Sequence, residues 1–533
     1  MGAPPTVAEL LEGHVSLEVD CFDRLYLNAY VPTLQTAGAT VRFLTRHRGH
    51  PIPSPALFGQ MGDRFRSAVK DFAAAHAIPL IPFKAGERKL EVMAPRLAAA
   101  TGPGVVAIGT AQETQWVTMG ADPRRDPASG VPRYSFRRAE RRVSVFYFYI
   151  ADAEWGPCFI KLCAYFPYPG KVWCNGHEFA KRQLERRGIA YEALANGFRS
   201  CQDPDALAAI CAALGPADVQ ALVDRWMAVI PLPLTVEDRA AGYDWELSMR
   251  QVEISRTLVL DRPARARAFF ERVVEQGAGL GRHDEVELIF HRRVQRNTPG
   301  LFSTRIVHQG VEPRISIRYK ASRVKQYLKE GRAIRVETVI NNPTDVGVKR
   351  RLAHLRELGA IGRAVNRRIL EAQRVAAAPG PSTALFERVA LPDRRAGQRT
   401  VALRYGDPRA MCVMAALCLL IHQVAGIRNR SLRPLVEALL GRPYPASRMS
   451  YDLWRLRTNG LLRRLPKTHT WVLTPDGLRI ALFYAKSYRR LIDPLFAAAA
   501  PDAPPGLDPE LRLALHTIDG SITRWVQEAQ LAA

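Results

Sequence analysis

The stretch RRVSVFYFYIADAEWGPCFIKLCAYFPY, residues 141–168, places two aromatic-rich apolar runs on either side of Asp-Ala-Glu-Trp-Gly. Aromatic and β-branched residues favour strands, while a short polar segment that contains glycine favours a tight turn. The stretch therefore predicts a β-hairpin with its tip at residues 152–156. Because 533 residues are too many for a single compact core, we expect about two to four domains around it.

Upstream of the hairpin, apolar strand patterns alternate with a helical pattern. Residues 15–31 predict a buried strand followed by a turn or a second strand, and residues 60–77 predict a helix. A short apolar run covers 78–83, and 104–113 reads as another buried strand with its loop. This alternation predicts an α/β N-terminal domain over residues 1–135.

Downstream of the hairpin, helical periodicity starts near residue 176 and recurs over 204–228. Thr235 and Asp238 have the spacing of a helix N-terminal capping pair. We expect the helix behind this cap to include DWELSMRQVEISRTL, residues 244–258.

Two later segments, PRISIRYK at 313–320 and AIRVETVI at 333–340, alternate apolar and polar residues. Such alternation predicts a half-exposed sheet, with a short basic helix or loop between the two strands. A helix is expected over 346–375. The sequence thus predicts a basic α+β central domain over residues 136–375 and an α+β multidomain protein as a whole.

The C-terminal part is divided into a linker at 376–408, a module at 409–495 and a tail helix at 496–533. The module reads as three helices, two strands around Pro-Lys-Thr-His, and a last helix, which is the order of a winged helix. Ser431 is placed to cap the second helix, and Gly460 to end the third. The stretch LWRLRTNGLLRRLPKTHTWVLTPDGLRIA resembles bacterial winged-helix regulators, and this resemblance implies contact with DNA.

The third helix of this module divides its residues between two faces. Met449, Leu453 and Leu456 share a face that should pack on the first two helices. Another face carries Asp452 and the candidate DNA contacts; with the wing tip, these are Arg448, Tyr451, Arg455, Lys467 and His469. An amphipathic helix with solvated arginines, or a protein–protein module, remains the alternative.

The formal net charge is +25, from 76 Lys and Arg against 51 Asp and Glu. Such an excess attracts polyanions, although an arginine-rich composition also follows from a GC-rich genome. A basic cluster that contains one acid is formed by Arg314, Arg318, Lys320, Arg323, Lys325, Lys329, Arg332 and Arg335. Tyrosines within it can stack on bases, so DNA or RNA is the predicted partner.

The segment RISIRYKASRVKQYLKEGRAIRVETVIN, residues 314–341, is similar to part of plasmid and phage replication-initiator proteins. In that family a tyrosine attacks a DNA phosphate with the help of a metal, which implies Tyr319 or Tyr327 as the nucleophile. The His-hydrophobe-His metal motif of that family is absent from this chain. A packed or stacking role for Tyr327 is the alternative.

Carboxylates at strand and helix ends in the first half match the oxygen ligands that Mg²⁺ prefers in phosphoryl-transfer nucleases. The candidate catalytic set is Asp20, Asp152, Glu154 and Glu178, with Asp20 and Asp152 as metal ligands. Several of these acids also suit ordinary structural roles. The hairpin pair is typical of turn chemistry, Glu178 suits a first helical turn, and the neighbouring Asp23 can pair with Arg24 or cap a turn.

Over nearly its full length the chain resembles a widespread, multi-copy family of bacterial proteins that carries no assigned function. The stretches that mark this resemblance are RFLTRHRGHPIPSPALF, FYFYIADAEWGPCFIKLCAYFPYPGKVWCNGHEFAKRQL and SRVKQYLKEGRAIRVETVIN. The resemblance implies a mobile-element or plasmid context and transfers no catalytic residue.

The expected compartment and activity of the protein follow from the motifs that the sequence has and lacks. It has no long apolar run for a membrane span, no secretory signal and no Cys-x-x-Cys pair, so we expect a cytoplasmic protein. The leading hypothesis is a nucleic-acid-processing protein with Mg²⁺-dependent phosphodiester chemistry. A non-catalytic DNA- or RNA-binding regulator or partner protein is the alternative, and a small-molecule enzyme with a regulatory winged helix is a third.

Overall fold

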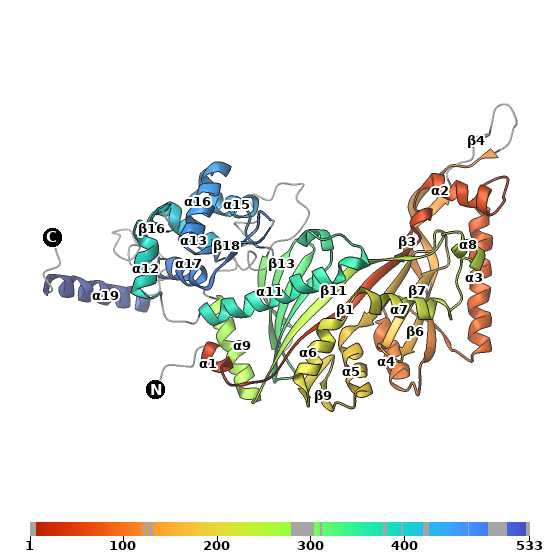
Figure 1. Ribbon diagram of the computed structural model, residues 1–533, viewed down its shortest axis with the longest axis horizontal. Helices are drawn as coiled ribbons and strands as arrows, with labels where there is room; N and C mark the ends of the chain where they lie inside the picture. Colours follow the sequence, from red (N-terminus) through yellow and green to blue (C-terminus); the bar gives the residue numbers. More distant parts are fainter. Residues whose placement is uncertain are drawn as a thin grey trace. The chain divides into compact units, whose positions relative to one another are not determined.

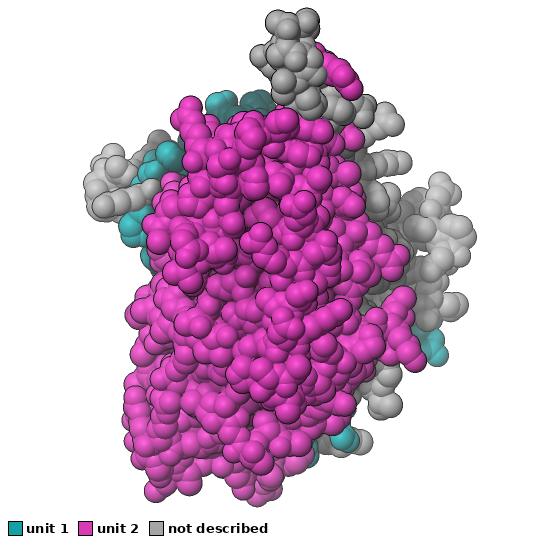
Figure 2. Space-filling view, turned by 90° about the vertical axis from the view of Figure 1, so that its right-hand side faces the viewer, with its two compact units in different colours: residues 1–14, 264–320, 367–533 teal, residues 15–263, 321–366 magenta. Residues whose placement is uncertain are grey.

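The computed structural model describes residues 7–120, 124–125, 132–278, 303–309, 312–376, 381–395, 398–418, 426–466, 468–488 and 509–528. They belong to two compact units that are interleaved along the chain (Figure 2). The first, here called the sheet unit, comprises residues 15–263 and 321–366. The second, the C-terminal unit, comprises residues 1–14, 264–320 and 367–533.

The sheet unit is built on a large mixed sheet whose strands follow the order β14-β15-β11-β1-β8-β7-β6-β3-β2 (Figure 1). Only β2 and β3 pair in parallel among these strands of the described chain, and the other neighbours are antiparallel. The bounds are β1 Val15–Tyr30, β2 Leu80–Pro82, β3 Gly104–Gly120, β6 Phe136–Asp152, β7 Gly156–Cys163, β8 Gly170–Asn175, β11 Glu246–Leu260, β14 Ser322–Lys329 and β15 Ala333–Ile340.

The predicted hairpin is confirmed as β6 and β7, which pair from Val145 opposite Cys163 to Asp152 opposite Gly156. It lies inside the sheet, with β3 on one side and β8 on the other. The boundary expected at residue 135 therefore falls between two strands, β3 and β6, that pair along their lengths. The strands β1, β2 and β3 belong to the same sheet as the hairpin. That sheet is largely antiparallel because hairpins and long returns connect its strands.

The first strand is longer than expected. β1 runs without a turn over 16 residues, where the sequence predicted a strand followed by a turn or second strand. A register shift occurs between Phe22 and Leu25. Two residues of β1, Asp23 and Arg24, therefore lie opposite the single residue Glu253 of β11, as in a β-bulge. The bulge lets the strand bend and continue, and it directs two charged side chains to one point of the sheet.

A helix was predicted over 244–258, and this prediction is wrong. The capping pair itself exists, since Thr235 and Asp238 cap the short helix α8 Val236–Ala240. The following residues form β11, which lies between β1 and β15 and is buried over most of its length. Pairing on both edges overrides the helical spacing of its apolar residues. In the same way β14 is a strand where a short basic helix or loop was expected.

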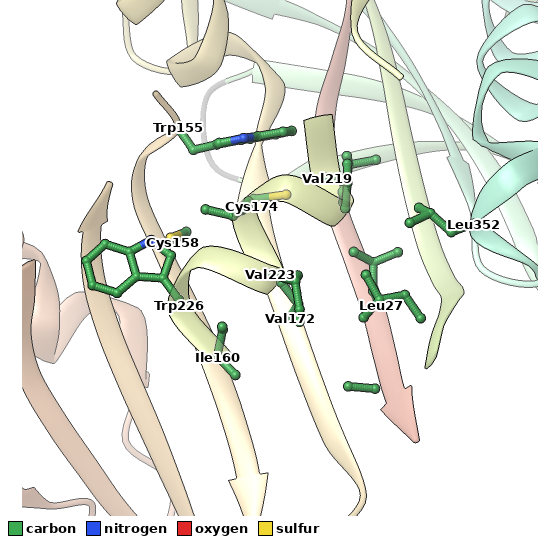
Figure 3. Close-up of a cluster of buried hydrophobic side chains, with 14 of the residues drawn as sticks. Leu27, Trp155, Cys158, Ile160, Val172, Cys174, Val219, Val223, Trp226 and Leu352 are labelled. Atoms are coloured by element: carbon green, nitrogen blue, oxygen red, sulfur yellow. The ribbon is translucent and has the colours of Figure 1, made fainter. Parts of the chain in front are cut away.

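Helices cover one face of this sheet, and their apolar sides make the main core. They include α3 Ala56–Ala75, α5 Gly176–Arg186, α6 Pro204–Ala213 and α7 Pro216–Met227. Figure 3 shows Val223 and Trp226 of α7 next to Ile160 of β7 and Val172 of β8. On the opposite face, Met93 of α4 (Lys89–Ala98) packs with side chains of β3 and β6.

The expected helix over 346–375 is α11 Leu355–Ala376, preceded by the 3₁₀ turns η3 Pro343–Val346 and η4 Leu352–His354. Within the described ranges, no single helix is both long and apolar enough to cross a membrane, although the bent pair α6 and α7 meets that test when taken together.

In the C-terminal unit, a module of residues 381–488 has its own apolar core. Its elements are α12 Thr383–Ala390, β16 Asp393–Arg395, β17 Gln398–Thr400, α13 Pro408–Leu417, α15 Asn429–Leu440, α16 Ala446–Thr458, β18 Leu462–Arg464, β19 Trp471–Leu473 and α17 Pro475–Ser487. Met449, Leu453 and Leu456 of α16 are buried in this core, as their spacing predicted. Ser431 is the third residue of α15, and its hydroxyl accepts a hydrogen bond from the backbone N–H of Arg428. The N-cap residue of this helix is therefore Arg428 and not Ser431.

The linker expected at 376–408 is structured wherever the chain is described. Leu385 and Val389 of α12 are buried in the module core, because they form an apolar pair at helical spacing. The same unit contains α1 Val7–Leu11, α9 Pro263–Ala278, a hairpin of β12 Ser303–Gln309 and β13 Glu312–Tyr319, and α19 Pro509–Glu528. α19 lies within the predicted tail helix.

Substitution of Ile160 by alanine is expected to lower the free energy of unfolding by about 2–5 kcal/mol, because it leaves a cavity between β7 and α7. Ile160 is 1% exposed. The measurement is urea unfolding followed by tryptophan fluorescence. Val229→Ala is the control, because Val229 is 51% exposed and should change little. Equal effects of the two changes would contradict this account of the core.

Candidate functional site: an acid cluster and a cationic groove

The four carboxylates predicted to be catalytic are each held by local partners. Asp152 accepts hydrogen bonds from the backbone N–H groups of Glu154 (2.8 Å) and Trp155 (2.9 Å) and from Trp226 Nε1 (2.7 Å). These contacts close the hairpin tip and attach it to α7. Asp152 is therefore a buried structural residue, and the explanation by turn chemistry holds for it.

The other three members of the predicted set form ion pairs. Asp20 Oδ2 lies 2.5 Å from Arg256 Nη1. Glu154 lies between Arg186 and Arg225, at 3.0 and 2.8 Å. Glu178, in the first turn of α5, pairs with Lys181 at 2.7 Å. Among the described residues, none of the four belongs to a group of three or more ligating side chains close enough to share a metal ion.

The structure brings a different set of acids together. Asp23 of β1, Glu253 of β11 and Glu337 of β15 are all buried, and their ligand oxygens lie within 4.8 Å of one another. We call these three residues the acid cluster. The sequence contained two signals for it, the Asp23 next to Asp20 and the Arg-x-Glu of the strand 333–340. Their proximity depends on the bulge in β1 and on the pairing of three strands distant in sequence.

Arg335, predicted to bind phosphate, lies fully buried at the centre of the acid cluster. Its Nη2 donates to Asp23 (2.7 Å), its Nε donates to Glu337 (2.8 Å), and its Nη1 donates to the backbone carbonyl of Asn196 (2.6 Å). The phosphate-binding prediction is therefore wrong for this residue. Burial alone raises the pKa of Asp23, but Arg335, Arg24 and the Asn196 amide outweigh it and hold that pKa below its usual value.

Glu253 is the least satisfied member of the acid cluster. Its Oε1 accepts from Gln251 Nε2 at 2.6 Å, whereas no hydrogen-bond donor reaches its Oε2 within the described residues. Arg24 Nη1 lies 3.8 Å from that oxygen. Burial, reinforced by the negative charge of Asp23, raises the pKa of Glu253.

Tyr327, the proposed nucleophile, is tied to the same cluster. Its hydroxyl donates to Glu337 Oε1 at 2.6 Å. Burial, then the charge of Glu337, raises the pKa of this phenol, so its nucleophilic phenolate form is disfavoured at neutral pH. The packed role left open for Tyr327 is the one that its contacts favour.

His177 completes the environment of Arg335. Its Nε2 lies 2.9 Å from Ser255 Oγ and 3.1 Å from Arg335 Nη2, and the ring is fully buried. Burial, then the charge of Arg335, lowers the pKa of His177 well below its usual value, so the ring is neutral. A neutral ring accepts a hydrogen bond from the guanidinium and adds no charge to the cluster.

The acid cluster offers oxygen ligands of the kind that hard cations prefer, at a spacing that one metal ion can bridge. Two of its three carboxylates already receive donors from Arg335, and Glu337 also has Lys325 3.6 Å away. The buried guanidinium thus supplies positive charge where a metal would. A metal would fit this site only after Arg335 had withdrawn.

The remaining cations of the basic middle differ in exposure. Arg318 is exposed, while Lys320, Arg323, Lys329 and Arg332 are half-buried. Lys325 is only 14% exposed beside Glu337, and burial lowers the pKa of Lys329. The side chains of Arg314 and Tyr319 lie outside the described residues. This stretch is therefore partly a structural network and not a uniform exposed basic face.

In the C-terminal module, a cavity of about 650 Å³ opens between the start of α15, the helix α16 and the β18–β19 hairpin. We call it the cationic groove. Its lining residues are Arg428, Asn429, Arg430, Ser450, Leu453, Arg464, Thr468, His469, Thr470 and Trp471. None of these described residues is acidic. The hairpin tip was predicted as a contact from the sequence, but the three arginines were not. Their signal in the sequence was their position beside a helix start and in a strand.

The groove is shaped by hydrogen bonds among its own residues. Arg428 Nε donates to Thr470 Oγ1 at 2.9 Å, and Arg464 Nε donates to the Thr468 carbonyl at 2.7 Å. Asn429 Nδ2 donates to Ser450 Oγ at 2.8 Å, which joins α15 to α16. These contacts engage the Nε atoms of Arg428 and Arg464, and Arg464 Nη2 also lies 3.2 Å from His469 Nδ1. The other N–H groups of the guanidinium groups can donate to a ligand.

The predicted recognition face of α16 divides in two. Arg448 is exposed, and Tyr451 is exposed and stacked on Trp454 with ring centroids 5.7 Å apart. Arg455, in contrast, is buried with its Nη1 3.0 Å from Asp452, which also pairs with Arg409. Its predicted contact with DNA is wrong, because the segment before α13 covers this side of α16. Lys467 lies outside the described residues.

No family model, curated protein or solved structure matched the chain.

Arg335→Met is expected to lower the free energy of unfolding by about 3–5 kcal/mol, because it leaves Asp23 and Glu337 buried without their counter-charge. Urea unfolding at neutral pH measures the loss. Arg332→Met, in the turn before β15, is the matched control and should cost less than about 1 kcal/mol. If Arg335→Met lowered the free energy of unfolding as little as the control does, the buried guanidinium would be dispensable for stability.

The variant Glu253→Gln tests whether ionisation of Glu253 destabilises the fold, through the pH dependence of the free energy of unfolding. Since burial raises the folded pKa above the unfolded value of about 4.3, the stability of the wild type falls as pH rises from about 4 through that folded pKa. The variant lacks this penalty. It should therefore match the wild type near pH 4 and exceed its free energy of unfolding at pH 8.

The control for this comparison is Glu246→Gln, at the exposed start of the same strand. It should leave the pH dependence of unfolding unchanged. An equal gain from Glu253→Gln at both pH values would show that ionisation of Glu253 is not the cause.

Proposed function

We propose that this chain is a nucleic-acid-binding protein whose C-terminal module contacts the phosphate backbone of DNA or RNA. The observation that carries the proposal is the cationic groove, in which three arginines and a histidine gather without a carboxylate among the described lining residues. A surface of this charge attracts polyanions and loses affinity as salt is added. The sequence resemblance makes plasmid or mobile-element DNA a natural target.

The chemistry of the groove suits a phosphate. Arg428 and Arg430 lie at the start of α15, where the helix dipole adds partial positive charge. Arg464 faces them from β18, so that guanidinium donors approach from two sides. Arginine binds phosphate oxygens with two parallel N–H groups, which gives both strength and orientation.

The order of elements supports a winged helix as the form of this module. α13, α15 and α16 precede the hairpin β18–β19, and Ile427 forms a bridge to Trp471 that extends the small sheet. In winged helices of this order the third helix enters the major groove while the wing touches a neighbouring phosphate. In this arrangement Arg448, Tyr451 and Trp454 of α16 would lie towards the bases.

The geometry favours binding without catalysis. The carboxylates predicted for phosphodiester chemistry are engaged in ion pairs and in the hairpin turn, and Tyr327 is bonded to Glu337. We therefore place the non-catalytic regulator or partner protein ahead of the nuclease. A protein–protein role for the module is a possible outcome of the test below.

The double variant Arg430→Ala/Arg464→Ala is expected to weaken binding of a short duplex and to flatten its dependence on salt. Removal of each phosphate contact should reduce the slope of log K against log salt by about 0.9. Fluorescence anisotropy of labelled DNA and RNA across a salt series measures both quantities with the full-length protein.

Arg442→Ala is the matched control for this series, because Arg442 is exposed just past the opposite end of the same helix, α15. It should leave the slope unchanged. Equal losses of affinity in the double variant and in Arg442→Ala would mean that these arginines act only through the overall charge of the protein and that the groove is not a specific site. An absence of binding by the wild type at low salt would leave the protein–protein role.

A second candidate function is Mg²⁺-dependent phosphodiester cleavage, which the spacing of the acid cluster favours. The test is incubation of the protein with single- and double-stranded DNA and RNA in the presence of Mg²⁺ or Mn²⁺. Cleavage that disappears in Glu253→Gln would support the acid cluster as a metal site. Intact substrates under all of these conditions would exclude this function for the purified chain.

A further inference from the structure

The face of the large sheet opposite α5, α6 and α7 carries a row of aromatic side chains across four neighbouring strands. Tyr26 of β1 lies opposite Trp173 of β8, Trp173 lies opposite Phe159 of β7, and Phe159 lies opposite Tyr149 of β6. We call these four residues the aromatic row. Because they are in register, their side chains leave the sheet on the same side.

The rings of the aromatic row form one packed surface. Phe159 and Trp173 are stacked, with centroids 5.9 Å apart and planes 11° apart. Phe159 also contacts Tyr149, at 5.6 Å, and Tyr26, at 6.3 Å. The indole and the phenyl ring are thus held nearly parallel to each other.

A row of cations runs next to the aromatic row. Lys171 of β8 lies opposite Lys161 of β7, one step along the strands from Trp173 and Phe159. Lys171 and Arg250 each lie 5.5 Å from the ring centroid of Tyr26. Glu113 forms ion pairs with Lys161 and with Lys89, whereas no carboxylate of the described residues forms an ion pair with Lys171 or Arg250.

Tyr149 is the least exposed residue of the aromatic row. Tyr149 is buried beside Phe83, whereas Phe159, Trp173 and Tyr26 are half-buried. Arg250, at the β11 end, is exposed. Burial and the neighbouring charges of Lys161 and Arg250 lower the pKa of Lys171 to about 8, so an anion bound there would relieve an existing repulsion. The accessible part of the surface is therefore the part where aromatic rings and unpaired cationic charge coincide.

We propose that this face binds single-stranded nucleic acid, with bases stacked on Trp173 and Phe159 and the backbone held by Lys171 and Arg250 beside Tyr26. The inference rests on the proposed function only in taking the partner to be a nucleic acid. Charge complementarity selects a polyanion, and the aromatic row selects one with exposed π-faces. Bases offer their faces when they are unpaired, so the single strand is the preferred form.

The test uses full-length protein and short oligothymidine and oligouridine strands, with a blunt duplex for comparison. Trp173→Leu keeps an apolar side chain in the sheet but removes the stacking surface, and it should weaken single-strand binding about tenfold while leaving duplex binding unchanged. Binding of the oligonucleotide to the wild type should also quench tryptophan fluorescence, and the variant should lose much of that quenching.

Two further variants keep the test decisive. Trp116→Leu is the control, because Trp116 is 58% exposed on β3 and lies outside the row. Lys171→Met leaves all the rings in place and should reduce the salt slope of single-strand binding by about one phosphate contact. It therefore answers the question even if Trp173→Leu disturbs folding, which circular dichroism and thermal unfolding would reveal.

The outcomes separate this site from the cationic groove. Single-strand affinity that is unchanged in both Trp173→Leu and Lys171→Met overturns the proposal, whatever the groove does. Single-strand binding that depends on Trp173 but not on Arg430 and Arg464 would support the aromatic row as the single-strand site and exclude the cationic groove from that role. Binding of acidic peptides by the aromatic row, with no affinity for oligonucleotides, would also overturn the proposal.

Discussion

The ion pairs of Arg335 are the interaction on which the sheet unit most depends. One fully buried guanidinium joins β15 to Asp23 in the bulge of β1 and to the carbonyl of Asn196 between β9 Tyr191–Leu194 and β10 Gly197–Cys201. A buried charge is costly unless it is paired and hydrogen-bonded, so this arrangement tolerates little change in its neighbours. It holds together strands from both ends of the unit's sequence.

The same interaction explains why net charge is a poor guide to binding surfaces in this protein. Arg335 and Lys325 are used inside the sheet unit, Arg455 is used inside the C-terminal module, and each faces a buried acid. Other cations lie in the cationic groove, whose described lining residues include no acid, and beside the aromatic row, where Glu113 pairs with Lys161 and Lys89. The surplus charge is thus divided between structural ion pairs and two separate surfaces.

Those two surfaces have different chemistry. The cationic groove combines guanidinium groups with a helix start, which suits the phosphates of a backbone. The aromatic row combines ring faces with two cations, which suits unpaired bases. If both proposals hold, the protein would bind a duplex through the cationic groove and a single strand through the aromatic row. In this interpretation the ion pairs of Arg335 with Asp23 and Glu337 have a structural role in the sheet.

Local chemistry in the sequence determined much of the secondary structure. The hairpin of β6 and β7, the cap at Thr235 and the buried face of α16 each depend on residues close in sequence, so their patterns were sufficient. The tertiary structure decided which strands meet and which charged groups face one another. β11 is a strand because β1 and β15 pair with its two edges, which no local spacing reveals. Arg335 and Arg455 look like exposed cations in the sequence. Arg335 is buried because the distant Asp23 pairs with it, and Arg455 is buried because the segment at Ala402 covers it. The aromatic row likewise exists only through the register of four strands, since pairing between strands, and not the order of residues, brings those rings to one face.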